Sequence, residues 1–274
     1  MRSRLLGLVG PTFGAALLLL TAAAPEAEAQ DLDRTRFLRW AHEDAAALLQ
    51  DVSMGTPLLV VTGAAVLIPS SRLDDPVLEG IQEGYHGPLA SYLQVSNEVG
   101  GTKALPAVTA IFAVSLAAGK PKFQDAAFTS LQSLVFAGVM TRGLKMAFGR
   151  YRPESGNGAF RFDSFSGNTS FPSGHTAAAF AVITPWVLYY PNAATYGLFA
   201  LSTGTAVARI AMDKHWPTDV LAGAAIGFLT ARYLARRHQL DNPETPRLNV
   251  APAMTGTGAG VTLRFRLNHA AESH

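Results

Sequence analysis

Apolar stretches without charged residues alternate with short polar joints along most of the chain. Beyond residue 30, the uncharged stretches are 52–71, 104–119, 126–141, 176–208 and 220–231. These stretches are helical in character, and Pro191-Asn192 divides the longest one into two helices. The pattern therefore predicts an all-α fold. Several stretches are shorter than the roughly 20 residues that a bilayer crossing needs, so they fit either membrane spans or buried helices of a bundle.

The last part of the chain has a different pattern. Residues 241–247 form a polar, proline-containing linker. Apolar residues then alternate with other residues at Val261, Leu263, Phe265 and Leu267. Together with a preceding Gly-Thr-Gly turn, this alternation predicts a short β-hairpin. We interpret residues 241–274 as a linker and an appendage without a catalytic role.

The N-terminal residues have the features of an export signal. Two arginines precede an apolar stretch, 5–24, and the small residues Ala27 and Ala29 then occupy the positions that a signal peptidase reads. This pattern predicts a signal peptide over residues 1–29, with an exported domain over 30–240. An uncleaved anchor helix is the alternative.

The composition excludes several classes of function. The chain has 274 residues, 49% of them hydrophobic, with a formal charge of +2 and no cysteine. A charge this small, without basic runs interleaved with aromatic residues, argues against nucleic acid as a partner. Without cysteine, the chain cannot form disulfides, thiolate metal sites or a cysteine nucleophile.

The first candidate motif for chemistry is the stretch KMAFGRYRP. Lys145 is followed by Arg152-Pro153, and Gly149 between them is expected to end a helix, so that the arginine turns back towards the lysine. Two positive charges then face one point. Alone, this motif is also compatible with a basic helix end that compensates the helix dipole.

The second motif is Pro-Ser-Gly-His at residues 172–175. Ser173 is a good N-cap for a helix that begins near His175, so the N–H groups of the first helical turn can bind an anion. Gly174 allows the anion to approach closely, and His175 lies beside it. Taken singly, a histidine here is more often a capping or packing residue than a catalytic one.

The third motif lies in the stretch ARIAMDKHWPTDV. Arg209 precedes His215 by six positions, and Pro217 suits the first position of a helix. This places Asp219 in the first turn, where its carboxylate can return to the imidazole of His215. An aspartate in that position fixes the histidine tautomer and frees the other ring nitrogen to act as a nucleophile or base.

In this order the three motifs resemble the signature of the type 2 phosphatidic acid phosphatase (PAP2) superfamily, which includes bacterial class A acid phosphatases and vanadium haloperoxidases. The resemblance implies a bundle of about six core helices. It also implies a set of groups that bind the phosphoryl oxygens: Lys145, Arg152, Ser173, Gly174 and Arg209. By the same resemblance, His215 is the nucleophile, Asp219 orients it and His175 protonates the leaving oxygen.

The activity implied by the resemblance is that of a phosphoric ester hydrolase. It would cleave a phosphomonoester or pyrophosphate through a phosphohistidine, without a metal or another cofactor. Lipid phosphates and isoprenoid pyrophosphates are the implied substrates. One departure concerns Ala208, since the family usually has serine directly before the arginine of the third motif. Because all the charged residues remain, we expect tuned rather than abolished activity.

Three alternative functions remain compatible with the sequence. A soluble exported acid phosphatase of broad specificity would use the same residues. A haloperoxidase would bind vanadate as its cofactor in the same anion site. A non-enzymatic membrane bundle is disfavoured by the intact set of charged residues.

The location of the site follows from the order of the helices. In an up-down bundle the three motifs share one end, and a second group of lysines and arginines lies at the other. The positive-inside rule then predicts an exported, membrane-associated enzyme whose site faces the periplasm or exterior. This orientation conflicts with three full crossings after a cleaved leader, so a soluble periplasmic protein stays open as well.

Overall fold

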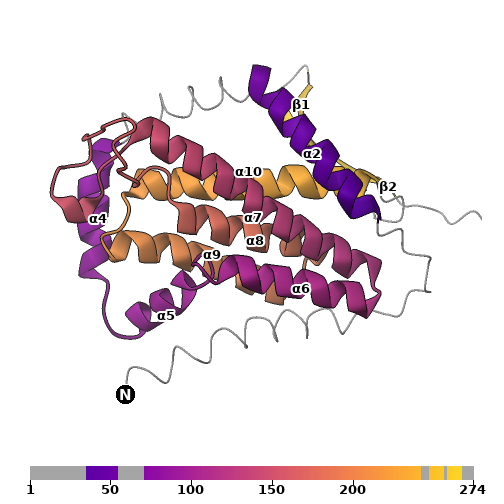
Figure 1. The fold of residues 1–274 in the computed structure, drawn as a ribbon, viewed down its shortest axis with the longest axis horizontal. Coiled ribbons are helices and arrows are strands. Elements are labelled where there is room, and N and C mark those ends of the chain that lie inside the picture. The colour runs from indigo at the N-terminus through magenta and orange to yellow at the C-terminus, as the bar shows by residue number, and fades with distance from the viewer. Residues whose placement is uncertain (1–34, 55–70, 242–246, 256–257, 267–274) are drawn as a thin grey trace, which may run out of the picture. The chain divides into compact units, whose positions relative to one another are not determined.

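The computed structural model describes residues 35–54, 71–241, 247–255 and 258–266. Its α-helices are α2 (Thr35–Met54), α4 (Asp74–Glu83), α5 (Gly87–Asn97), α6 (Ala104–Ala118), α7 (Pro121–Phe148), α8 (Gly174–Tyr189), α9 (Ala193–Ala211) and α10 (Pro217–Asp241) (Figure 1). Two short 3₁₀ helices are η1 (Ser71–Leu73) and η2 (Pro153–Ser155). The chain divides into two compact units, Met1–Ala235 and Arg236–His274. The predicted all-α bundle is confirmed.

Local signals in the sequence set most of the helix boundaries in the bundle. Gly149 adopts φ 57° and ends α7, because the left-handed conformation costs glycine little. Asn192 caps α9, since its side-chain oxygen accepts the N–H of Thr195 at 3.1 Å. Pro217 is the first residue of α10. All three boundaries agree with the sequence-based prediction.

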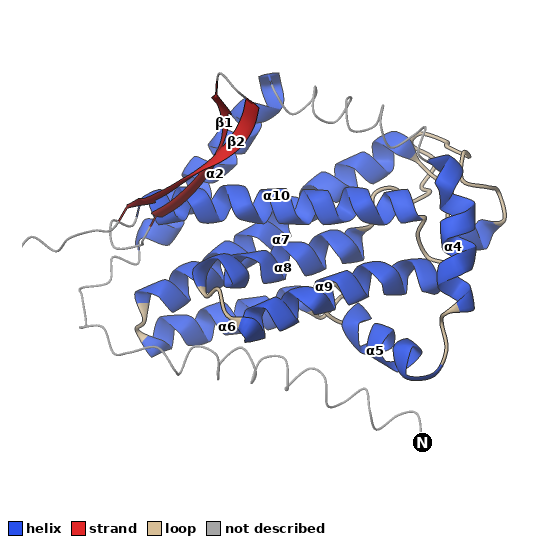
Figure 2. Ribbon diagram, turned by 180° about the vertical axis from the view of Figure 1, so that it is seen from behind, coloured by secondary structure: helices blue, strands red, loops and turns tan. Residues whose placement is uncertain are grey.

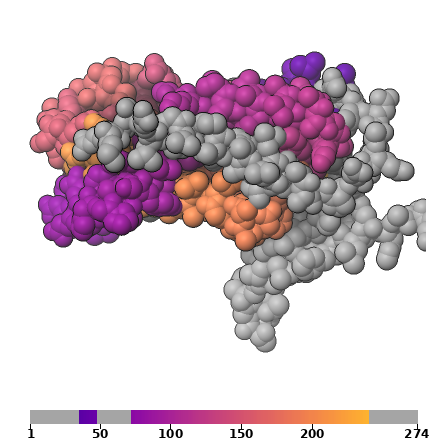
Figure 3. Space-filling view, turned by 90° about the horizontal axis from the view of Figure 1, so that it is seen from below, coloured from indigo at the N-terminus to yellow at the C-terminus, as the bar shows by residue number. Residues whose placement is uncertain are grey.

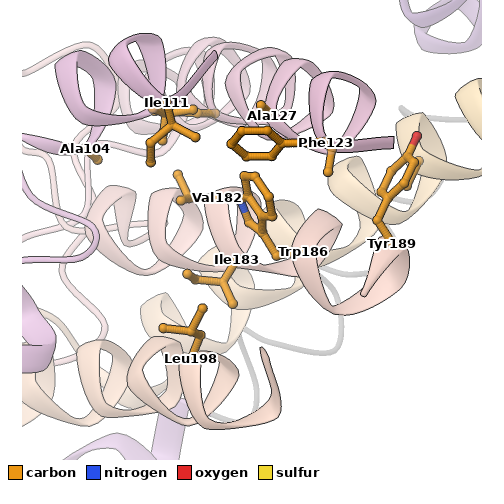
Figure 4. Close-up of a cluster of buried hydrophobic side chains, with 13 residues drawn as sticks. Ala104, Ile111, Phe123, Ala127, Val182, Ile183, Trp186, Tyr189 and Leu198 are labelled. Atoms are coloured by element: carbon orange, nitrogen blue, oxygen red, sulfur yellow. The ribbon is translucent and has the colours of Figure 1, made fainter. Parts of the chain in front are cut away.

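The main hydrophobic core lies between α6, α7, α8 and α9 (Figure 4). Trp186 of α8 is 1% exposed, and its ring centroid lies 5.7 Å from that of Phe123 in α7. Ile111 of α6 and Leu198 of α9 belong to the same cluster. Burying side chains of this size stabilises a fold by about 1.5–3 kcal/mol each. The core therefore fixes the helices whose ends carry the motifs.

Two glycines let α10 approach the backbone of α8. A Cβ atom added at Gly223 would lie 2.4 Å from the carbonyl oxygen of Ser173, and one at Gly227 would lie 2.2 Å from that of Ala177. Any larger residue would push the helices apart, because real Cβ atoms do not approach backbone so closely. This contact brings the start of α10, with the third motif, against the second motif.

The helices α4 and α5 lie at the end of the bundle where the loop after α7 and the start of α10 are found (Figures 1 and 2). Figure 3 shows α4 and α5, in purple, at the same end as that loop, in salmon. Helix α5 packs closely on α9: a Cβ atom at Gly204 would lie 2.4 Å from the hydroxyl oxygen of Ser96. The hydroxyl of Thr205 donates to the carbonyl oxygen of Ser96 at 2.5 Å.

Helix α2 packs on α7 through both polar and apolar contacts. The guanidinium of Arg36 donates to the carboxylate of Asp125 at 2.9 Å. The rings of Phe37 and Phe128 lie 4.9 Å apart, and Trp40 belongs to the same cluster. The contact with α2 therefore covers the N-terminal half of α7.

The two strands β1 (Arg247–Thr255) and β2 (Gly258–Arg266) form an antiparallel two-stranded sheet. Their register pairs Arg247 with Arg266 at one end and Thr255 with Gly258 at the other. This is the β-hairpin that the alternation of apolar residues predicted.

Most of the uncharged stretches correspond to helices of the bundle. The stretch 104–119 is α6, and 126–141 is the middle of α7. In the part of the chain that the structure describes, no helix combines the length and the apolar character needed to cross a membrane. The predicted signal peptide, 1–29, and most of the stretch 52–71 lie outside the described residues.

Candidate active site

The end of α7 and the residues after it place two cationic side chains, Lys145 and Arg152, against the same residue. Lys145 lies in the last turn of the helix, and the chain reverses after Gly149. The ammonium group of Lys145 donates to the carbonyl oxygen of Thr169, and the guanidinium of Arg152 donates to the hydroxyl of the same threonine at 3.2 Å. The predicted return of the arginine towards the lysine is therefore present in the structure.

The second motif forms the N-terminus of α8. Ser173 is the N-cap residue, and its hydroxyl oxygen lies 3.5 Å from the backbone nitrogen of Thr176. The first-turn N–H groups of a helix have no partners within it, so they are suited to an anion. A Cβ atom at Gly174 would lie 3.7 Å from Cε of Lys145. The lysine side chain thus reaches the start of α8.

The third motif spans the turn between α9 and α10. The carbonyl oxygen of Arg209 accepts the N–H groups of Lys214 and His215, each at 3.1 Å, which closes the turn. The guanidinium of Arg209 donates to the side-chain oxygen of Asn97 in α5 at 3.3 Å. Arg209 is 8% exposed and burial lowers its pKa to about 10, which still leaves it charged at pH 7.

His215 and Asp219 form a buried pair. The Nδ1 atom of the imidazole lies 3.6 Å from Oδ2 of the carboxylate, beyond the usual hydrogen-bond distance, and the two side chains are 2% and 0% exposed. The same Oδ2 accepts the hydroxyl of Ser170 at 2.5 Å and the N–H of Trp216 at 3.0 Å. Since Nδ1 faces the carboxylate, Nε2 is the ring nitrogen available to a substrate.

Arg150 holds the other oxygen of Asp219, and sequence analysis did not identify it. Its guanidinium is 1% exposed and donates to Oδ1 of Asp219 at 2.7 Å and to Oδ2 of Asp74 at 2.6 Å. Further bonds go to the hydroxyl of Thr218 at 2.7 Å and to the carbonyl oxygen of Ala159. The only signal in the sequence is a second arginine within the first motif, because Asp74 lies far away along the chain.

Positive charges surround His175. Burial lowers its pKa to about 4. Four neighbouring groups that can carry positive charge act in the same direction: Arg209, His215, Lys145 and Arg152. The imidazole of His175 is therefore neutral at pH 7 in the site without an anion.

The protonation states of Lys145, His215 and Asp219 suit a neutral nucleophile next to a positive charge. Burial lowers the pKa of Lys145 to about 8, although the charge of Asp219 opposes this effect. Burial likewise lowers the pKa of His215 to about 4. Burial alone would raise the pKa of Asp219, but its contacts with His215 and Arg150 outweigh burial and hold it below its usual value. At pH 7 the lysine is protonated, the aspartate ionised and the imidazole neutral.

The departure at position 208 is accommodated by packing. Ala208 is 0% exposed and lies in an apolar cluster with Leu93 and Ala211. A serine hydroxyl here would need a hydrogen-bond partner among apolar neighbours or its own helix. The alanine thus fits the contact between α5 and α9.

The arrangement suits an anion better than a metal ion. Lys145, Arg152 and Arg209 are cationic, and the nearby carboxylates of Asp74 and Asp219 already accept bonds from Arg150. Within the residues that the structure describes, no group of three or more histidine, aspartate or glutamate side chains is placed to hold a metal ion. Phosphate and vanadate have the charge and oxygen geometry that these donors match.

Comparison with known proteins agrees with the geometry. Residues 126–242 match the PAP2 superfamily. The chain is 35% identical over 113 residues to the lipid A 1-phosphatase of Rhizobium johnstonii, covering 38% of this chain and 46% of the relative. It is 36% identical over 99 residues to the lipid A 1-phosphatase of Porphyromonas gingivalis, covering 35% of this chain and 20% of that protein.

The chain thus spans about half the length of the Rhizobium relative and about a fifth of the Porphyromonas one. The crystal structure of Aquifex aeolicus LpxE is 20% identical, with a TM-score of 0.44 over 60% of this chain and 95% of the other. The family match covers all three motifs, from the second turn of α7 through the end of α10. Residues 126–242 of the chain therefore match the family that the three motifs predicted.

Proposed function

We propose that this protein hydrolyses the phosphomonoester of a lipid phosphate through a phosphohistidine, without a metal ion. One observation carries the proposal: the buried His215–Asp219 pair lies among three cationic side chains at the N-terminus of α8. Phosphoryl transfer depends mainly on positioning and on neutralising the charge of the equatorial oxygens. The candidate site supplies both.

Binding of the phosphoryl group is assigned to the cations and to the start of α8. Lys145, Arg152 and Arg209 neutralise the equatorial oxygens, and first-turn N–H groups beside Ser173 and Gly174 complete the contacts. These donors are held before substrate arrives, because Arg209 is bonded to Asn97 and the other two cations are bonded to Thr169. Little reorganisation is then needed at the moment of reaction.

His215 is assigned as the nucleophile. Its pKa of about 4 keeps the imidazole neutral at pH 7, so a lone pair on Nε2 is available. As Nε2 forms its bond to phosphorus, the bond between phosphorus and the ester oxygen breaks. The positive charge that develops on the ring is stabilised by the carboxylate of Asp219. Water then attacks the phosphohistidine and releases inorganic phosphate.

His175 is assigned as the acid that protonates the leaving oxygen. Its pKa of about 4 in the free site means that the imidazole is neutral at pH 7. A bound phosphate dianion adds negative charge beside it and raises this pKa, so substrate binding brings a proton to His175. That proton passes to the ester oxygen, and the attacking water later returns one to the imidazole.

A lipid phosphate is the proposed substrate class, and membrane association on the exported side the proposed location. Two relatives named lipid A 1-phosphatase support this choice over a soluble acid phosphatase or a haloperoxidase. Two large apolar side chains of the loop after α7, Phe160 and Phe165, are 53% and 82% exposed. Phe165 donates its backbone N–H to the carbonyl oxygen of Met146, next to Lys145. Exposed aromatic residues there suit contact with lipid.

A substrate panel tests the proposal. The purified protein is assayed on lipid A, phosphatidic acid, soluble phosphomonoesters and, with vanadate and peroxide, bromide. We expect phosphate release from the lipids to exceed that from soluble esters, to survive EDTA and to be inhibited by vanadate. Loss of activity with EDTA and rescue by magnesium would contradict the mechanism. Preference for soluble esters, or bromide oxidation, would favour the alternatives.

A further inference from the structure

A buried carboxylate outside the family match contacts the catalytic machinery through Arg150. Asp74, at the start of α4, is 0% exposed and accepts from Arg150 at 2.6 Å. It also accepts the backbone N–H of Thr218 at 2.9 Å and the hydroxyl of that residue at 2.7 Å. Asp74 therefore joins α4 to the first turn of α10, directly beside Asp219.

Every donor of the Arg150 guanidinium has an acceptor. Nε donates to the carbonyl oxygen of Ala159 at 3.0 Å, and one terminal nitrogen donates to Thr218 and Asp219. The other terminal nitrogen donates to Asp74 and, at 2.6 Å, again to Ala159. A planar guanidinium fixed at five points has no freedom to turn. Its position relative to the Asp219 carboxylate is thereby set.

The charges of this cluster do not cancel. Asp74 and Asp219 carry two negative charges against the one positive charge of Arg150, so a net negative charge lies next to His215. Without Asp74, the arginine and Asp219 would form a neutral pair, and the potential at the imidazole would become more positive. Burial makes such differences matter, because water screens them little.

We propose that Asp74 is a positioning residue, which balances Arg150 so that the carboxylate of Asp219 remains oriented and charged for the His215 imidazole. This inference rests on the proposed function for its kinetic consequences. It also makes a prediction about the imidazole itself that does not depend on turnover.

Other charged groups around His215 also influence the pKa of its imidazole. They come from each element packed against it: Asp219 of α10, Lys145 of α7, Arg209 of α9 and His175 of α8. The two basic side chains lower the pKa of His215 and Asp219 raises it. Removing the negative charge of Asp74 acts in the same direction as the basic groups. The pKa of His215 is expected to fall further below its already lowered value of about 4.

The test replaces Asp74 with an isosteric neutral residue. We expect Asp74→Asn to lower kcat by about 10- to 100-fold, the usual cost of losing an outer partner of a carboxylate–histidine pair, with KM changed by less than about threefold. A less basic His215 also moves the acidic limb of the pH–rate profile to lower pH. Histidine NMR titration of the same variant, with the His215 signal assigned through His215→Gln, reads the pKa directly.

Asp75→Asn is the matched control. Asp75 lies in the same first turn of α4 and is exposed, so its replacement removes the same charge from the helix terminus without touching Arg150. For Asp75→Asn we expect the wild-type kcat and an unchanged pKa of His215. If Asp74→Asn does not fold, Thr218→Val breaks the hydroxyl link between Asp74 and Arg150 without changing charge, and we expect it to lower kcat severalfold.

Each result decides the inference. A lower kcat together with a lower pKa of His215 in Asp74→Asn supports it, and so does a severalfold loss of kcat in Thr218→Val. An unshifted His215 in Asp74→Asn overturns it, even if stability or kcat falls, and so does wild-type kcat in Thr218→Val. If the wild-type protein releases phosphate from no substrate, the proposed function fails, and the titration of His215 alone decides the role of Asp74.

Discussion

Two regions of the chain supply the candidate site, and they do so in different ways. Residues 145–219 carry the motifs and, in the proposed mechanism, the nucleophile, the acid and the phosphate-binding cations. Helices α4 and α5 contribute Asp74 and Asn97, which bond to Arg150 and Arg209 rather than to a substrate. The first region thus contains the groups proposed to act on the substrate, and the second contains groups that position them. Changes in the first region should abolish or alter the chemistry, whereas changes in the second should tune it.

The largest effect is expected at His215, the proposed nucleophile. We predict that His215→Ala lowers kcat by about 10⁵- to 10⁶-fold, because no other group can form the bond to phosphorus. Single-turnover assays of phosphate release measure the loss, with the exposed Asp75→Asn variant as the control for handling and folding. Residual turnover within about a hundredfold of the wild type would show that another residue attacks phosphorus.

The next effect depends on the substrate. His175→Ala should lower kcat on alkyl phosphates by about two to four orders of magnitude, because an alkoxide leaving group needs a proton. On an activated aryl phosphate the loss should be much smaller. A series of esters with graded leaving-group pKa measures this dependence. Equal losses across the series would remove the acid role from His175.

A smaller effect follows from the lowered pKa of Lys145. As pH rises through about 8, the free enzyme loses the lysine proton and with it one positive charge for the phosphate. We expect kcat/KM to fall by up to about tenfold per pH unit above that value, since this parameter reports groups of the free enzyme. Lys145→Arg should shift the basic limb upward, because a guanidinium stays charged. If the basic limb of the pH profile is unchanged in Lys145→Arg, the limb reports the titration of another group.

The smallest effect is expected from the α4–α5 region at Asn97. Asn97→Ala removes the side-chain partner of Arg209, and we predict a rise in KM of about fivefold with kcat nearly unchanged, from one hydrogen bond worth about 1 kcal/mol. Gln94→Ala, an exposed position on the same helix, is the matched control. A collapse of kcat with normal KM would mean that α5 contributes to the chemistry itself.

The sequence predicted the parts of the site that depend on local rules. The N-cap at Ser173, the helix end at Gly149 and the start of α10 at Pro217 each follow from the conformational preferences of one residue. The network of Asp74 and Arg150 could not be predicted in this way. Its contacts join distant segments, and neither residue has a spacing that marks it.

The length of α7 likewise could not be predicted from local sequence alone. The uncharged stretch 126–141 predicts only the middle of a helix that begins at Pro121. The charged residues before the stretch are inside the helix because tertiary partners accept them. Asp125 pairs with Arg36 of α2, and the ammonium of Lys122 lies 4.8 Å from the ring centroid of Tyr190. Charge alone therefore did not mark the helix boundary.

Rapid quench under conditions that preserve phosphohistidine tests the role of His215 most directly. Wild-type protein is mixed with an activated aryl phosphate, quenched within one turnover at alkaline pH, digested and mapped by mass spectrometry. We predict a single phosphorylated peptide that carries the modification on His215, stable to base and lost in acid, and absent from His215→Ala. A burst of product without any phosphoenzyme, or phosphate on another residue, would contradict the assignment of His215 as the nucleophile.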